Sequence, residues 1–425
     1  MSTSQTPTDP TAVPAGPVVP ADLQDERLIA AQGLRGWAGA TWERVKSGDL
    51  GSLPVVVGLV IIWGVFYALN PAFISSRNLV NLSLQMVPTG VLALGVVLVL
   101  LLGQIDLSIG SMYGLSGAVL VVLFVNQGAP IAVAVLLALA AGAVVGLVYG
   151  LLFNRFGVPS FVITLAGLLA ILGLQLRVLG TDGTVNLPFE SAIVQFASQM
   201  YLPAWLSYVL AVAVPVVYLA SRLRTDRRRV AAGLSATPVT MVAVRAAVMG
   251  VLLVVVVAVL NDDRGLSTMV VLFLALVVVM DLAIRRTTWG RSVLAIGGNV
   301  EAARRAGIDV KRTFLSVFVL CSTFAALGGI LGAARLASAN QSSGGADTNL
   351  NAIAAAVIGG TSLFGGRGSA YSALLGILVI YSISNGLALL SVSADIRYIV
   401  TGAVLLLAVV IDSLSRRSRA AHGRA

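Results

Sequence analysis

Three polar side chains interrupt a long apolar run. The run 79–125 is broken at 103–111, where Gln104, Asp106 and Ser108 stand between two glycines. A carboxylate at membrane depth can exchange a proton, and with an amide and a hydroxyl it can hydrogen-bond a polyhydroxylated ligand. Because non-helical backbone at that depth must lie inside protein or line a cavity, one interpretation is a broken helix beside a pathway. The alternative is an ordinary cytoplasmic turn between two spans.

Polar residues upstream in the same run favour the pathway interpretation slightly. Asn81, Gln85 and Thr89 follow one another at helical spacing, so one helix face would present all three. The candidate pathway residues are therefore Asn81, Gln85, Gln104, Asp106 and Ser108.

Residue clusters that would support catalysis or metal binding are missing from the sequence. The one histidine is His422, in a basic tail, and the one cysteine is Cys321, which is most simply a small core residue. A phosphate-binding loop needs glycine before its lysine and Ser or Thr after it. Lys46 follows a valine and Lys311 precedes an arginine, so neither fits. We predict no catalytic residue, no metal site and no nucleotide bound by this chain.

A second polar segment is the basic loop 285–312, which lies between two long apolar runs. Residues 301–305 are good helix formers, and Gly307 can end that helix in a left-handed conformation. We expect a short helix along the membrane surface that a soluble partner can grip. Its candidate contact residues are Glu301, Ala302, Ala303, Arg304 and Gly307.

The elements that must position these segments are membrane-spanning helices. Of the 425 residues, 58% are hydrophobic and only 11% are charged, and the mean hydropathy is +0.96. The apolar residues form runs near the roughly 20 residues that a spanning helix needs. We predict an all-α, polytopic membrane bundle of about 10–12 helices, because three of the twelve candidate runs are short. The runs are 53–69, 79–102, 112–125, 130–153, 160–179, 202–220, 239–260, 269–284, 313–337, 350–364, 370–390 and 395–412.

The net charge of +10 is explained by topology. With the N-terminus inside, twelve spans leave only Arg77 and Arg264 in the outer loops, whereas the inner segments hold most of the other basic residues. This bias predicts that both termini are cytoplasmic and that anionic lipid is a neighbour. We predict no nucleic-acid partner.

The chain divides into four predicted regions. Residues 1–21 are rich in proline, and this composition predicts a disordered cytoplasmic N-terminus. Residues 22–50 form an amphipathic juxtamembrane segment or, equally well, a loosely structured leader. Residues 51–413 are the transmembrane domain, and 414–425 are a basic cytoplasmic tail.

Glycine and polar residues mark three further features. Gly142, Gly146 and Gly150 recur every four residues and predict a groove for close helix packing. The segment 338–349 is polar and falls outside, where it can receive a ligand or form a flexible loop. The segment 359–369 is a tight Gly-rich turn on the inner side, whose glycines allow close backbone approach.

The sequence Glu301-Ala302-Ala303-x-x-x-Gly307 resembles the cytoplasmic E-A-A-x-x-x-G loop of ABC importer permeases. More narrowly, several segments resemble the permeases of ribose/xylose/galactose-type sugar importers. These are 106–111, 295–299, 335–339 and 351–363. The similarity covers about 53–415. The I-x-L-P tail of many importer permeases is absent, and residues near 221–284 look like an insertion similar to that of xylose-type members.

The resemblance implies a transport subunit in a bacterial plasma (inner) membrane that moves monosaccharides. It implies two ABC ATPase subunits that bind ATP and grip the loop at 301–307, a second permease copy, and an extracytoplasmic sugar-binding protein. This chain would hold no cofactor of its own. The alternative from another class is an ion-coupled secondary sugar carrier that uses Asp106.

Overall fold

The described part of the chain is almost entirely helical, which confirms the all-α prediction. The computed structural model describes residues 53–421, so the predictions for 1–21 and 22–50, and the last four residues of the predicted tail, lie outside it. The helices run in chain order as α2 (Leu53–Leu69), α3 (Ser76–Leu101), α4 (Ile109–Val121), α5 (Ile131–Phe156), α6 (Ser160–Leu179), α7 (Ala192–Ser198), α8 (Ala204–Ala231), α9 (Val239–Asn261), α10 (Thr268–Arg286), α11 (Thr288–Gly298), α12 (Val300–Arg305), α13 (Val310–Leu336), α14 (Ala346–Ile358), α15 (Ala370–Leu389) and α16 (Ala394–Ala421). Short helical turns η2 (Pro71–Ile74), η3 (Val122–Asn126) and η4 (Gly180–Asp182) join some of them.

Nine helices within the described residues are long and apolar enough to cross a membrane. They are α3, α4 with η3, α5, α6 with η4, α8, α9, α10, α13 and α15, and α2 is a shorter apolar helix.

The predicted span 350–364 is wrong, because α14 has only 13 residues and ends before Gly359. At 1.5 Å per residue it is about 20 Å long, short of a hydrocarbon core about 30 Å thick. The last helix, α16, extends beyond the predicted span and includes most of the predicted tail.

Residues 208–256 form a compact unit of their own, made of most of α8 and α9. It is a helical hairpin whose first helix contains Pro215 and ends in several arginines. The sequence suggested an insertion at 221–284, but α10 belongs to the other unit, where it packs against α3 and α15. The separate piece is therefore the α8–α9 hairpin.

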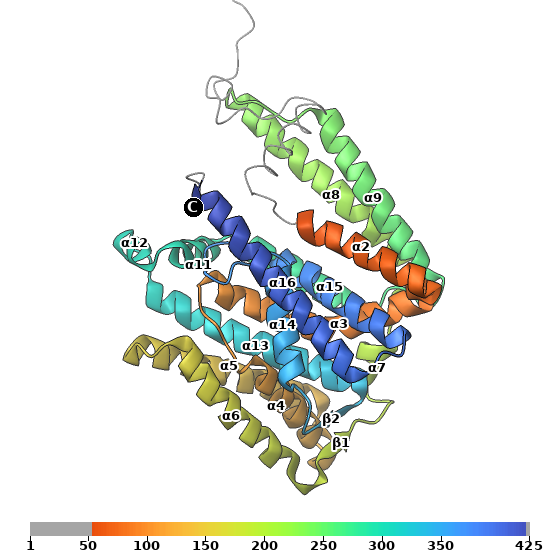
Figure 1. Cartoon of the computed structure of the whole chain (residues 1–425), viewed down its shortest axis with the longest axis vertical. Coiled ribbons are helices and arrows are strands. Elements are labelled where there is room, and N and C mark those ends of the chain that lie inside the picture. Colours follow the sequence, from red (N-terminus) through yellow and green to blue (C-terminus); the bar gives the residue numbers. More distant parts are fainter. Residues whose placement is uncertain (1–52, 422–425) are drawn as a thin grey trace, which may run out of the picture. The chain divides into compact units, whose positions relative to one another are not determined.

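In the larger unit, α3 is the central helix. It is buried over nearly its whole length and packs against α10, α13, α14 and α15 (Figure 1). The neighbouring α13 also packs against α4 and α5. On α5, Gly142, Gly146 and Gly150 face α13, and a Cβ added at Gly142 would lie 2.6 Å from the Ser322 carbonyl oxygen. The predicted glycine groove is confirmed, with α13 as its occupant.

Two polar loops that are distant in the sequence pair as a short antiparallel ribbon. Strand β1 (Thr184–Asn186) pairs with β2 (Ser338–Asn340), with Val185 opposite Ala339. Gln175, near the end of α6, holds this ribbon because its amide nitrogen donates to the carbonyl of Asn340, the last residue of β2, at 3.1 Å. The sequence predicted a polar outer segment at 338–349 and gave no sign of this pairing.

Candidate coupling helix and pathway segment

The short helix predicted near residue 301 is present as α12, and it has a hydrogen-bonded cap at each end. At its start, the Asn299 side chain accepts from the Ala302 backbone N–H at 2.9 Å. At its end, Gly307 has a φ of 81°, and the Ile308 N–H donates to the Ala303 carbonyl at 3.1 Å. Gly307 therefore ends the helix in the left-handed conformation that the sequence predicts.

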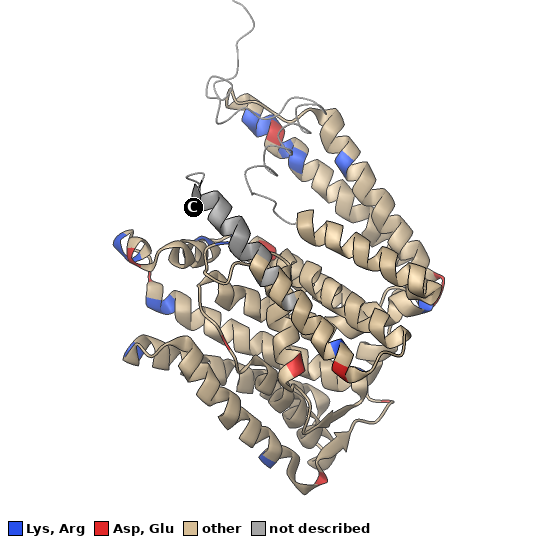
Figure 2. Ribbon diagram, in the orientation of Figure 1, with Lys and Arg blue, Asp and Glu red and all other residues tan. Residues whose placement is uncertain are grey.

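One residue anchors α12 and most of the others are exposed. Ala303 is buried against the bundle, whereas Glu301, Ala302, Arg304 and Gly307 are exposed. Of the two alanines in the pattern, only Ala303 is buried. Glu301 and Arg304 form an ion pair at 2.6 Å, and their side chains remain 66% and 60% exposed. The helix thus offers a rigid backbone with both signs of charge on its open surface (Figure 2).

Residues 102–108 connect α3 to α4 without helical structure. Gly103, with a φ of 70°, ends α3, and the chain then runs extended into the bundle until α4 begins. Side chains from two other helices satisfy its backbone. The Leu107 N–H donates to Thr164 of α6 at 3.1 Å, and Asn349 of α14 donates to the Leu107 carbonyl at 2.9 Å. The interruption in the apolar run is therefore an extended segment held against α6 and α14, in which Asp106 and Ser108 are buried and Ile105 is partly exposed.

Asp106 uses its carboxylate to fix the start of α4. Its Oδ1 accepts from the Ser108 N–H at 2.8 Å and from the Ser108 Oγ at 2.7 Å. Its Oδ2 lies 3.9 Å from Cys321 Sγ of α13, and both residues are buried. Cys321 is a core residue, as the sequence predicted. These contacts give Asp106 a local structural task.

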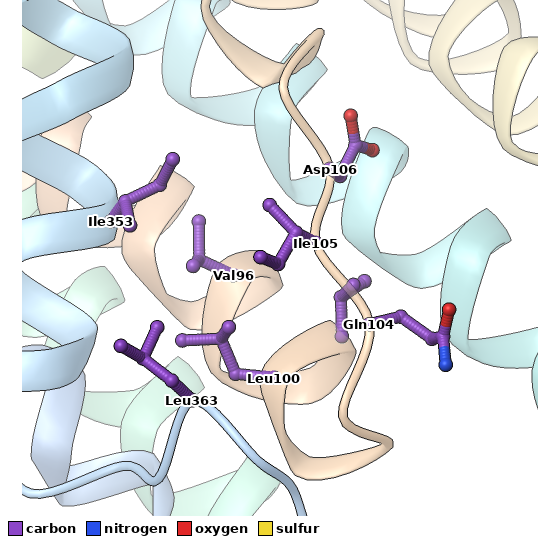
Figure 3. Close-up of a pocket in the computed structure, with 8 residues that line it drawn as sticks. Val96, Leu100, Gln104, Ile105, Asp106, Ile353 and Leu363 are labelled. Carbon is purple, nitrogen blue, oxygen red and sulfur yellow. The ribbon is translucent and has the colours of Figure 1, made fainter. Parts of the chain in front are cut away.

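A small apolar cavity lies beside this segment. Only about 20 Å³ is open to the centre of a water molecule, which is room for about one water. Figure 3 shows Ile105 pointing toward Val96 across the cavity, while Gln104 and Asp106 point to the other side of the segment. Apolar residues from four parts of the bundle complete most of the lining. They are Val96, Val99, Leu100, Ile105, Ile353 and Leu363.

The other two candidate pathway residues lie far from Asp106. Asn81 and Gln85 are half-buried in the first turns of α3, and Arg264 donates to the Asn81 side chain. The helix rises about 30 Å from Asn81 to Leu101, so the first turns of α3 and Asp106 lie near opposite ends of that helix. Between them, the buried Thr89 hydroxyl lies 2.7 Å from the Tyr381 hydroxyl of α15.

Sequence reasoning missed the residues that hold the extended segment 102–108 in place. Ser160 and Thr164 of α6 and Asn349 of α14 all bond to its backbone. Each is a polar residue within or beside an apolar run, and that is the signal that marked Asn81 and Gln85. Nothing in their spacing indicates the segment that they contact.

The features described so far define a class, a multi-span membrane protein with an exposed surface helix. The family described as the permease component of branched-chain amino acid transport systems matches residues 78–409, so the chain belongs to this family. The chain is 37% identical over 374 residues to the xylose transport system permease protein XylH of Escherichia coli K12. The aligned region covers 88% of this chain and 94% of that relative. It is 35% identical over 376 residues to the Haemophilus influenzae protein of the same name, covering 88% and 99%.

A relative with a different printed substrate also matches over most of its length. The ribose import permease protein RbsC of Bacillus subtilis is 32% identical over 365 residues, covering 86% of this chain and 94% of the relative. No solved structure gives a significant match. These matches confirm the resemblance to sugar-transport permeases of the ribose and xylose type.

Proposed function

We propose that this chain is the permease subunit of an ATP-driven ABC importer for a monosaccharide such as xylose, ribose or galactose. The observation that carries the proposal is α12, an exposed, doubly capped helix with the E-A-A-x-x-x-G pattern in a chain of this family. The names of the relatives support a pentose as the first substrate to test.

In this proposal α12 is the coupling helix. Glu301, Ala302 and Arg304 present the surface that an ABC ATPase subunit grips, and Ala303 fixes that surface to the bundle. ATP is bound and hydrolysed by the partner, and this chain has no ATPase site. A second copy of the permease completes the pathway, and an extracytoplasmic binding protein supplies the sugar. Selectivity can then reside largely in that donor protein.

The charge pattern supports the proposed topology in a bacterial plasma (inner) membrane. The Asn154 side chain donates to the Lys311 carbonyl at 2.9 Å, so the end of α5, with Arg155, adjoins the start of α13. Figure 2 shows basic residues on α12 and at the start of α13. Basic residues gathered at one end of a membrane bundle favour a cytoplasmic location for that end, with both termini on the same side.

The alternative is a secondary carrier that uses the Asp106 carboxylate to couple sugar to an ion. The hydrogen bonds of Asp106 favour the importer over this carrier, because one carboxylate oxygen already accepts twice from Ser108. Uptake of radiolabelled xylose with a protonophore, at maintained cytoplasmic ATP, separates the two mechanisms. The importer proposal expects uptake to persist and to stop when ATP is depleted. Uptake that stops with the protonophore while ATP is constant would favour the carrier.

A further inference from the structure

Three glycine-containing segments meet at the end of α3. Gly103 follows that helix, Gly297 and Gly298 form the end of α11, and Gly365 and Gly366 belong to the turn between α14 and α15. We call Gly103, Gly297, Gly365 and Gly366 the glycine seam. Since none of these four residues has a side chain, backbone packs directly on backbone there. From the sequence, the Gly-rich turn had no task beyond close backbone approach.

The contacts in the glycine seam leave no space for a side chain. The Gly366 N–H donates to the Leu101 carbonyl at 2.9 Å. A Cβ added at Gly297 would overlap the Leu101 carbonyl oxygen and lie 2.5 Å from the Gly366 nitrogen. One added at Gly365 would lie 2.7 Å from the Gly297 oxygen and 2.9 Å from the Gly103 nitrogen. The three segments are therefore in mutual contact through main-chain atoms.

The glycine seam is continuous with the lining of the apolar cavity. Leu100 lies in the last turn of α3, Ile105 two residues after Gly103, and Leu363 two residues before Gly365. All three line the cavity, and Figure 3 shows Leu100 and Leu363 beside each other on its wall. A shift of the seam backbone would therefore move these three side chains with it.

At its other side the glycine seam adjoins α12. Helix α11 ends at Gly298, and only Asn299 separates it from α12. Asn299 is itself fixed, because its N–H donates to the Ala295 carbonyl at 3.0 Å and its side chain caps α12. The connection from α12 to the seam thus has no loose residue that could absorb a displacement.

We propose that Gly297 and Gly366 are positioning residues that transmit movement of α12 to the pathway. When a partner displaces α12, the end of α11 pushes through main-chain contacts on the end of α3 and on the Gly-rich turn. Leu100, Ile105 and Leu363 then separate, and the small apolar cavity between them opens. Close-packed atoms transmit such a shift, whereas flexible side chains would absorb it. This inference rests on the proposed function.

A matched pair of adjacent glycines tests the inference. In the permease–ATPase complex, Gly297→Ala introduces a methyl group into the seam, whereas nothing lies within 4 Å of a Cβ at Gly298. We expect Gly297→Ala to keep ATPase binding and ATP hydrolysis but to lower uptake of radiolabelled xylose about tenfold, within the usual range of coupling energies. Gly298→Ala should match the wild type. Equal uptake by Gly297→Ala and wild type would overturn the inference.

A second variant decides the question if Gly297→Ala lowers the yield of folded protein. One glycine inserted between Gly298 and Asn299 leaves the seam intact and adds about 3.8 Å of slack before α12. We expect it to retain the ATPase and to lose uptake, and normal uptake would contradict the inference. If the wild type itself recovers no ATPase, the proposed function fails, and that result is distinct from a failure of transmission.

Discussion

At the scale of single residues, α12 depends on a few side chains with different tasks. Ala303 is buried and fixes the helix to the bundle, while Glu301 and Arg304 stay exposed as an ion pair. An exposed pair of this kind contributes little to stability. We propose instead that the pair serves recognition, because it gives α12 a defined arrangement of charge that a partner can bind.

Gly307 tests whether the shape of α12 matters. Its φ of 81° suits glycine, is tolerated by asparagine and is closed to proline. We expect Gly307→Pro to abolish xylose uptake with insertion unchanged, and Gly307→Asn to retain at least about half of it, since the left-handed conformation costs a non-glycine residue only about 1–2 kcal/mol. Uptake in whole cells, normalised to membrane protein, is the measurement. Normal uptake by the proline variant would remove the assignment of α12 as coupling helix.

Substitutions at Asp106 distinguish a carboxylate with a structural task from one that couples transport to an ion. Asparagine can still accept from Ser108 through its side-chain oxygen, but it has no charge to titrate. We expect Asp106→Asn to transport nearly as well as wild type, and Asp106→Ala to transport several-fold less because it loses hydrogen bonds of about 1 kcal/mol each. ATPase recovery should be unchanged in both. Loss of uptake in the asparagine variant as well as in the alanine variant would support ion coupling.

Sequence reasoning identified residues whose environment is local. Gly307 ends a helix by its own conformation, and the isolation of Asp106 in an apolar run marked the break. It missed Thr164 and Asn349, because both contact Leu107 from far away in the sequence. Thr164 is 57 residues from Leu107, and Asn349 is 242 residues from it. Such partners depend on which helices pack together, and no local pattern contains that information.

At the scale of elements, the cap of α12 should tune its function. The Asn299 side chain satisfies the Ala302 N–H, and substitution of such a cap by alanine costs about 1 kcal/mol. We expect Asn299→Ala to lower uptake partially and Asn299→Asp to leave it near wild type, because aspartate caps equally well. Initial uptake rates measure the effect. Equal rates for alanine and aspartate would show that the cap has no part in coupling.

Helix prediction succeeded where length and hydropathy suffice, as for α3, α5 and α13. It was wrong for α14, because the apolar residues after Ile358 continue into the Gly-rich turn and not into a longer helix. It also gave no sign that β1 and β2 would pair, since three-residue strands in polar loops carry no periodic signal.

At the scale of the whole molecule, the topology can be tested with introduced cysteines. Cys321 is buried and gives a low background. Gln341 is exposed beside the β1–β2 ribbon, and Gly298 has open space around it. In intact cells we expect a membrane-impermeant maleimide to label Gln341→Cys and to label Gly298→Cys only after permeabilisation. Labelling of Gly298→Cys in intact cells would reverse the proposed orientation.

The most direct test of the central claim is recovery of an ABC ATPase with the tagged permease in mild detergent. Three proteins are compared: wild type, Glu301→Lys on α12, and Glu190→Lys. The last makes the same charge change at another exposed site, outside α12. We expect to recover an ATPase with wild type and with Glu190→Lys, and to lose it with Glu301→Lys. An ATPase recovered equally with all three, or with none of the folded proteins, would contradict the account.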